Sequence, residues 1–126
     1  MNVNEKIYVA GHRGLVGSAI LRKLQQEGYS DLVFRSSGEL DLTDNAKVDS
    51  FFESERPDYV FLAAAKVGGI QANIKYPVEF LLRNLMIQNS VIMACVKYKV
   101  KKLCFLGSSC IYPKECPQPM KEEYLL

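Results

Sequence analysis

The fold of this chain follows from the stretch KIYVAGHRGLVGSAI, residues 6–20. Its first part is a short run of apolar and β-branched residues that stops at Gly11, which is typical of a buried strand. Apolar residues then recur at helical spacing over residues 14–27, and Gly28 stands where such a helix would stop. The residues expected on the apolar side of this helix are Leu15, Val16, Ile20, Leu21 and Leu24.

The turn GHRGLVG between these two elements spaces its glycines as GxxGxxG, not as the commoner GxGxxG. Gly11 permits a tight turn, Gly14 leaves room for a pyrophosphate beside the backbone, and Gly17 lets the helix lie close to the strand. The start of the helix adds unpaired N–H groups and a partial positive charge. A glycine-bearing turn without a ligand is the alternative, but its position directly between a strand and a helix favours a nucleotide site.

The remainder of the chain continues this alternation of strands and helices. Strands are predicted at residues 31–35, 58–65 and 101–109, and helices within residues 41–57 and at 77–98. This order predicts an α/β fold, a Rossmann-type doubly wound parallel sheet with helices on both faces. We expect the sheet to be incomplete, with about four βα units, and all 126 residues to form one cofactor-binding domain.

Two local features refine this prediction. Thr43 is a candidate N-cap for the second helix, which should end before Pro57. The segment KVGGIQANIKY, residues 66–76, is predicted to be a long glycine-bearing loop after the third strand. Ligands bind at this edge of open parallel sheets, so the loop should border the site.

Composition narrows the range of partners. The net charge is only +2, so we expect neither a nucleic-acid partner nor an anionic membrane surface. We expect no membrane span and no signal peptide, because no apolar run suits either. The four cysteines form no CxxC pair and His12 is the only histidine, so no metal site is expected. Reduced thiols suggest a cytoplasmic protein.

The end of the second predicted strand bears on the choice of nucleotide. NAD-binding domains usually place a carboxylate there for the ribose 2′-hydroxyl, but this chain has Arg35 followed by two serines. Arg35 and Arg13 have the guanidinium geometry that suits a 2′-phosphate, which favours NADP(H) over NAD(H). The alternative for Arg35 is a solvated surface charge. Glu39 follows too late to act as the 2′-hydroxyl carboxylate.

Four segments, GHRGLVGSAI, DLTD, LAAAKVGGI and FLGSSCIYP, resemble the extended short-chain dehydrogenase/reductase family. AAAKVGG and GSSCIYP are the specific parts, and they are similar to the branch that epimerises and then reduces a GDP-linked 4-keto sugar. The resemblance implies an NADP-dependent oxidoreductase and epimerase of nucleotide-sugar metabolism. Its substrate would be a GDP-sugar, and the helix at residues 77–98 would contribute to a homodimer of the full-length enzyme. The alternative is that other parts of the same enzyme cover the outer side of this helix.

The resemblance also implies where the cofactor lies along the chain. The glycine turn would hold the pyrophosphate, residues 37–42 the adenosine with Asp41 near adenine, residues 63–66 the path to the nicotinamide ribose, and residues 106–109 the nicotinamide. Asn84 would face the cofactor side of its helix. The cofactor-binding residues so predicted are Gly11, His12, Arg13, Gly14, Leu15, Val16, Gly17, Arg35, Ser37, Asp41, Leu42, Ala63, Ala64, Ala65, Lys66, Asn84, Leu106, Gly107, Ser108 and Ser109.

Two catalytic residues are implied by the motif at the end of the fourth strand. Ser108, four residues before Tyr112, would donate a hydrogen bond to the 4-keto oxygen of the sugar as charge develops there. Cys110 would act, together with a later histidine, as acid and base in the epimerisations at C3 and C5. Without the resemblance, the serines are equally well explained as caps of a polar turn.

The family's proton-donating tyrosine and its lysine occupy a YxxxK motif downstream of the serine, and this chain ends at KEEYLL before one appears. The one literal match, Tyr98 to Lys102, precedes Ser108 and straddles a helix end, so we interpret it as chance. We therefore expect the N-terminal part of a longer enzyme, inactive alone, without the substrate domain, the YxxxK segment and the epimerase histidine. Another nucleotide-sugar epimerase or dehydratase, or a non-catalytic nucleotide-binding module, remain the alternatives.

Overall fold

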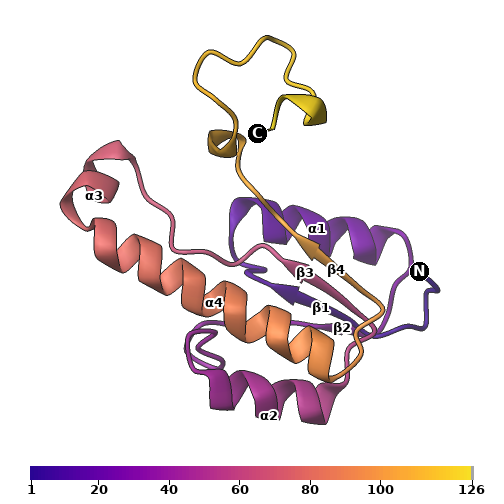
Figure 1. Cartoon of the computed structure of the whole chain (residues 1–126). Helices are drawn as coiled ribbons and strands as arrows, with labels where there is room; N and C mark the ends of the chain where they lie inside the picture. The colour runs from indigo at the N-terminus through magenta and orange to yellow at the C-terminus, as the bar shows by residue number, and fades with distance from the viewer. Residues whose placement is uncertain (126) are drawn as a thin grey trace.

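A computed structural model describes residues 1–125 and contains one parallel sheet with helices on both faces (Figure 1). The strands are β1 (Ile7–Ala10), β2 (Leu32–Val33), β3 (Tyr59–Leu62) and β4 (Lys102–Phe105). The helices are α1 (Leu15–Gln26), α2 (Asn45–Glu55), α3 (Ile70–Lys75) and α4 (Pro77–Lys97), with short 3-10 helices at Ser109–Ile111 and Glu122–Tyr124.

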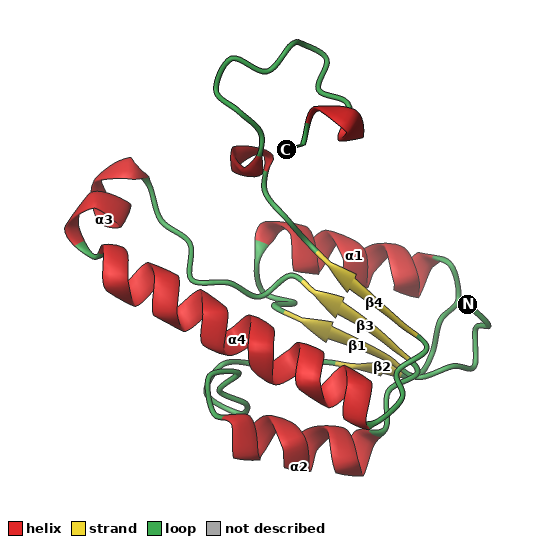
Figure 2. Cartoon of the chain, viewed as in Figure 1, coloured by secondary structure: helices red, strands yellow, loops and turns green. Residues whose placement is uncertain are grey.

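The sheet has the strand order β2-β1-β3-β4, and every neighbouring pair is parallel. The chain starts in the middle of the sheet, moves to β2 on one side and then crosses to β3 on the other. Figure 2 shows α1 on one face and α2 with α4 on the opposite face. The predicted doubly wound α/β fold is therefore confirmed. The change of direction beside β1 also creates the edge where such sheets bind ligands.

Burial follows this layering. All four residues of β1 are at most 1% exposed, because helices cover both of its faces. On the α2–α4 face, Tyr8 packs between Phe51 and Phe52, with its ring centroid 4.7 and 5.9 Å from theirs. On the other face, Ile7 and Val9 pack against Leu24 of α1. β4 lies at the edge of the sheet and is only half covered, with Phe105 48% exposed.

The start of α2 differs from the prediction. Asp44, not Thr43, is the N-cap, and its carboxylate accepts the N–H groups of Ala46 and Lys47 at 3.1 Å each. Thr43 instead donates both its backbone N–H and its hydroxyl to Asp41. The carboxylate one residue later reaches the orphan N–H groups of the helix, so the threonine is free to brace the loop before it. The predicted end before Pro57 is confirmed.

Other boundaries also shift. The strands are shorter than predicted, β2 most of all, because residues 34 and 35 leave the sheet after the two pairs Leu32–Ile7 and Val33–Tyr8. The predicted loop at residues 66–76 contains α3. Leu15 and Val16 do not join the core side of α1, since they are 90% and 49% exposed at its first turn. Gly28 ends that helix with a φ of 83°, as predicted.

No helix within residues 1–125 combines the length and the apolar character that crossing a membrane requires. The same residues contain no cluster of three or more potential metal-ligating side chains.

Candidate cofactor site

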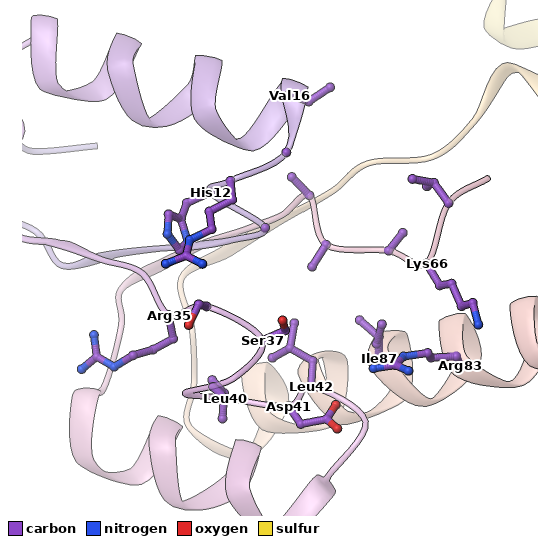
Figure 3. Close-up of a pocket in the computed structure, with 18 of the residues that line it drawn as sticks. His12, Val16, Arg35, Ser37, Leu40, Asp41, Leu42, Lys66, Arg83 and Ile87 are labelled. Carbon is purple, nitrogen blue, oxygen red and sulfur yellow. The ribbon is translucent and has the colours of Figure 1, made fainter. Parts of the chain in front are cut away.

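A cavity of about 620 Å³ opens at the carboxyl ends of the strands, between the glycine turn, the loop after β2, the loop after β3 and α4 (Figure 3). Most of the predicted cofactor-binding residues line it. They are Gly11, His12, Arg13, Gly14, Leu15, Val16, Arg35, Ser37, Asp41, Leu42, Ala63, Ala64, Ala65 and Lys66. The exposed first turn of α1 is therefore part of this wall, which is why Leu15 and Val16 are not in the core.

Two glycines of the turn, Gly11 and Gly17, are packed too closely for a side chain. Gly11 has a φ of 84°, and a Cβ there would lie 2.7 Å from the backbone of Ala63 and Ala64. A Cβ on Gly17 would lie 2.1 Å from the carbonyl oxygen of Gly11. Gly17 is buried behind the turn and does not line the cavity, so its role is to let α1 approach the end of β1.

The start of α1 is suited to an anion. Its N-cap is Gly14, no side chain caps the first turn, and that turn contains no acidic residue. The N–H groups of a helix start remain available when no cap accepts them, and the helix dipole adds positive potential. Because the turn also keeps Cβ atoms away from this end, the site fits a diphosphate group.

His12 packs the glycine turn against Phe34, the residue directly after β2. Its ring lies 4.8 Å from the ring of Phe34, centroid to centroid, and its Nδ1 is buried without a hydrogen-bond partner. An unprotonated nitrogen in that position costs less than a buried N–H without an acceptor, which favours the tautomer with the proton on Nε2. Nε2 is then the donor that His12 can offer to a ligand.

The predicted 2′-phosphate cation, Arg35, borders the cavity but is already paired. Its guanidinium donates to Glu55 Oε1 at 2.8 Å and to the carbonyl of Phe34 at 2.9 Å. Figure 3 shows this guanidinium pointing away from Ser37 and Asp41. Arg35 is therefore not the free solvated charge that was the alternative, and its geometry in this structure does not direct it at a ligand in the cavity.

Glu39 is also accounted for. Its Oε2 accepts the hydroxyl and the backbone N–H of Ser36 at 2.6 and 2.7 Å, and these bonds hold the pKa of Glu39 below its ordinary value. The carboxylate therefore stabilises the turn after β2, and Glu39 does not line the cavity, in accord with its late position in the sequence.

Charge around the cavity is mainly positive. Arg13, Lys66 and Arg83 line it together with Arg35, whereas Asp41 is the acidic residue among its walls. Hydrogen bonds from the backbone and then the hydroxyl of Thr43 lower the pKa of Asp41, so this carboxylate is ionised at neutral pH. An excess of cations over anions favours a polyanionic ligand.

Asn84 does not take the predicted position facing a cofactor. Its side-chain Oδ1 accepts the N–H of Lys66 at 2.7 Å, and its Nδ2 donates to the carbonyl of Lys66 at 3.0 Å. Both ends of the amide are thus used by the backbone of the loop after β3, and Asn84 is absent from the walls of the cavity. The residue shapes the cavity through that loop.

The residues predicted around the nicotinamide and the reaction lie outside the cavity. The backbone N–H of Leu106 continues the pairing with β3 at 3.3 Å from the carbonyl of Leu62, and the chain then leaves the sheet (Figure 1). Gly107, Ser108, Ser109 and Cys110 are exposed, and Ser108 Oγ accepts the N–H of Cys110 at 3.2 Å. The capping role that the sequence left open for Ser108 is therefore present in this structure.

Sequence reasoning missed three residues of the cavity, which are Ser36, Arg83 and Ile87. Leu40 and Val67 also line it, and they lie within the ranges 37–42 and 66–76 that the sequence placed at the site. Arg83 and Ile87 are four residues apart on α4, next to the buried face marked by Phe80 and Val91, so helical spacing alone was enough to find them. Ser36 carries no signal of that kind, because it lies in the turn after β2.

The chance interpretation of Tyr98 and Lys102 is supported by their placement. Tyr98 is the C-cap of α4 and donates its hydroxyl to Asp49 at 3.0 Å, whereas Lys102 begins β4. The two side chains do not share a helix face.

The sequence pattern of the NAD dependent epimerase/dehydratase family matches residues 7–126. This chain belongs to that family. The family resemblance that the motifs indicated is thereby confirmed, and the cavity lies at the carboxyl ends of the strands, beside β1, where the strand order of this parallel sheet reverses.

Named members of the epimerase/dehydratase family are similar over nearly the whole chain. GDP-L-fucose synthase 1 of Arabidopsis thaliana is 62% identical over 121 residues, which cover 96% of this chain and 38% of that protein. GDP-L-fucose synthase of Escherichia coli (strain K12) is 55% identical over 122 residues, which cover 97% of this chain and 38% of that protein. The chain thus spans about two fifths of the length of these curated relatives.

A solved structure gives the same picture. MlghC, a GDP-mannoheptose C4 reductase from Campylobacter jejuni with NADP bound, superimposes with a TM-score of 0.93 at 46% sequence identity. The superposition covers 99% of this chain and 40% of that one.

Proposed function

We propose that this chain is the NADP(H)-binding Rossmann domain of a GDP-L-fucose synthase. That enzyme epimerises GDP-4-keto-6-deoxy-D-mannose at C3 and C5 and then reduces C4 to give GDP-L-fucose. The observation that carries the proposal is the cationic cavity closed by a turn whose Gly11 and Gly17 leave no room for a Cβ. The similarity to GDP-L-fucose synthases of a plant and a bacterium, at 62% and 55% identity, supports the choice within the family.

Each wall of the cavity has a task in holding NADP(H), which supplies a hydride when bound. The N–H groups at the start of α1 would bind the diphosphate, and residues 37–42 would receive the adenosine. Arg13 and Arg35 would be the cations for the 2′-phosphate, with Arg35 turning from its present partner Glu55 to reach it. Residues 63–66 guide the ribose of the nicotinamide, and Asn84 holds that segment in place.

The reacting sugar depends on residues after β4. Ser108 Oγ already accepts a hydrogen bond from the N–H of Cys110, so its own proton is free to be donated to the 4-keto oxygen. A donor there stabilises the enolate that forms when C3 or C5 loses its proton, and later the oxygen that is reduced. Cys110 is exposed two residues further along the chain and would take these protons, while the family's later histidine would deliver protons from the opposite face of the sugar.

The partner surface of the proposed homodimer is the outer face of α4. One side of this helix is buried against the sheet and α2, as Phe80, Ile87 and Val91 show. The other side exposes apolar residues at successive spacings of four, three, eight and three positions. These residues are Val78, Leu82, Leu85, Met93 and Val96. Such a stripe suits packing against the same helix of a second copy.

Isotope exchange tests the proposed reaction in the complete gene product. With GDP-4-keto-6-deoxy-D-mannose in deuterated buffer, the wild type should incorporate deuterium at C3 and C5 and oxidise NADPH. Cys110→Ser should lose most of the exchange, whereas Ser108→Ala should lower both exchange and reduction by about 10²-fold. Cys116→Ser is the matched control and should behave like the wild type. Normal exchange in Cys110→Ser would remove the thiol from the mechanism.

A further inference from the structure

Glu55, the last residue of α2, pairs with two cations, one directly before β1 and the other shortly after β2. Its Oε1 accepts from Arg35 at 2.8 Å, and its Oε2 accepts from Lys6 at 3.2 Å. The side chain of Glu55 is 23% exposed, so the carboxylate is largely shielded from water. Both of its oxygens are therefore committed to protein partners.

Arg35 is the link between this carboxylate and the cavity. Its side chain lines the main cavity and also a second hollow of about 480 Å³, beside the start of α2. The guanidinium lies 5.7 Å from the centre of the Phe51 ring, and it donates to Phe34 and Glu55. Figure 3 shows that this arrangement turns the charged end away from Ser37. The stem borders the ligand space while the charge is held outside it.

We propose that Glu55 is a specificity-determining residue that competes with the 2′-phosphate of the cofactor for Arg35. This inference rests on the proposed use of NADP(H). A phosphate monoester at the end of β2 is an acceptor for the same fork of N–H groups that now binds the carboxylate. Binding of NADP(H) must therefore draw Arg35 from Glu55 or share it, whereas NAD(H) makes no such demand. The carboxylate lowers the preference for NADP(H) below what Arg35 alone would give.

Lys6 makes the exchange feasible. When Arg35 leaves, Glu55 still has its bond to Lys6, so the shielded carboxylate does not become an unpaired charge. Without Lys6, removing Arg35 would leave the shielded carboxylate of Glu55 unpaired, and that cost would oppose NADP(H) binding much more strongly. The pairing of one carboxylate with two cations thus holds Arg35 loosely enough for a ligand to take it.

Calorimetric titration of the complete gene product with NADP⁺ and with NAD⁺ tests the inference. Glu55→Gln removes the competing charge and should lower the dissociation constant for NADP⁺ about two- to fivefold, which is what a partly exposed ion pair contributes. The constant for NAD⁺ should stay unchanged. In an Arg35→Gln background, adding Glu55→Gln should change neither dissociation constant, because the guanidinium for which Glu55 and the 2′-phosphate compete is absent.

Controls separate this role from general stability. Glu53→Gln removes a charge from the same helix at an exposed position and should leave both constants as in the wild type. Thermal unfolding of each variant establishes that the folded proteins are compared. A Glu55→Gln variant with unchanged or weakened NADP⁺ binding would overturn the inference, since Glu55 would then be neutral or would position Arg35 for the ligand. A wild type that does not prefer NADP⁺ to NAD⁺ would instead overturn the proposed cofactor.

Discussion

The side-chain amide of Asn84 pairs with both backbone polar groups of Lys66, over 18 residues of sequence separation. This bidentate contact ties the loop after β3 to α4. Phe80 supports the same loop one turn earlier, because a Cβ on Gly68 would lie 2.8 Å from its ring. The Nζ of Lys66 also lies 5.1 Å from the centre of that ring. The wall of the cavity is therefore held by α4 and not by the sheet alone.

Replacement of Asn84 by alanine should loosen this wall. Two partly buried backbone groups would lose their partners, which should cost about 1–3 kcal/mol of unfolding free energy and weaken cofactor binding. Asn84→Asp keeps the acceptor for the N–H of Lys66 but opposes its carbonyl with a second oxygen, so it should be no more stable than the alanine variant. Urea unfolding and NADP⁺ titration measure both effects. Asn89→Ala, at an exposed position on the same helix, is the control, and a wild-type-like Asn84→Asp would contradict the paired geometry.

Gly17→Ala should be among the most damaging single-methyl changes in the chain. The added Cβ would meet the carbonyl oxygen of Gly11, so α1 must move away from the end of β1. We expect a loss of about 3 kcal/mol, at the upper end of overpacking effects, together with a large loss of cofactor affinity. Gly69→Ala is the matched control, because its Cβ would meet nothing within 4 Å. Equal melting temperatures for the two variants would show that the close approach is unimportant.

Substitutions of the adjacent residues Thr43 and Asp44, at the start of α2, should have different effects on stability and on cofactor binding. Asp44→Ala removes the acceptor for two N–H groups and should lower the unfolding free energy by about 1 kcal/mol. Thr43→Ala leaves the cap in place and should alter the Asp41 loop, and with it adenosine binding, more than the stability of the helix. Chemical denaturation and cofactor titration of both variants check this separation. A larger stability loss in Thr43→Ala would restore Thr43 as the cap.

Acid should lower the free energy of unfolding through Asp58, which lies directly before β3 at the amino ends of the strands. A hydrogen bond from Lys101, and then one from the backbone of Lys6, lower the pKa of Asp58. A carboxyl group whose pKa is lower in the folded state stabilises the protein above its unfolded pKa of about 4 and loses this contribution as the pH falls through the folded value. Unfolding free energies at pH 7 and pH 3 should therefore differ less in Asp58→Asn than in the wild type. Asp31→Asn, at an exposed position, should keep the wild-type difference.

A charge on the outer face of α4 should prevent the proposed dimer. Leu82 is 53% exposed within the apolar stripe of that helix, so Leu82→Asp should leave the monomer folded but shift sedimentation of the complete gene product to the monomer. Val3→Asp introduces the same charge at another exposed apolar position and serves as the comparison. A wild type that sediments as a monomer would contradict the dimer outright.

Local patterns were sufficient for the elements that have a periodic or turn signal. The buried run before Gly11, the extent of α4 and the glycine after α1 were all predicted correctly, since each depends on a few neighbouring residues. Chemistry could be predicted in the same way where the residues are consecutive, as in the glycine turn. The length of β2 had no such signal, because it depends on where the loop after it meets the sheet.

The order of residues thus established the alternation of strands and helices and the place of the glycine turn. Folding alone settled which partner each side chain found: Arg35 with Glu55, Asn84 with Lys66, and Asp44 with the start of α2. The first two pairs join residues about 20 positions apart, on elements brought together by packing. A side chain with several donors or acceptors takes the partner that packing places within about 3 Å, and no local pattern specifies that partner in advance.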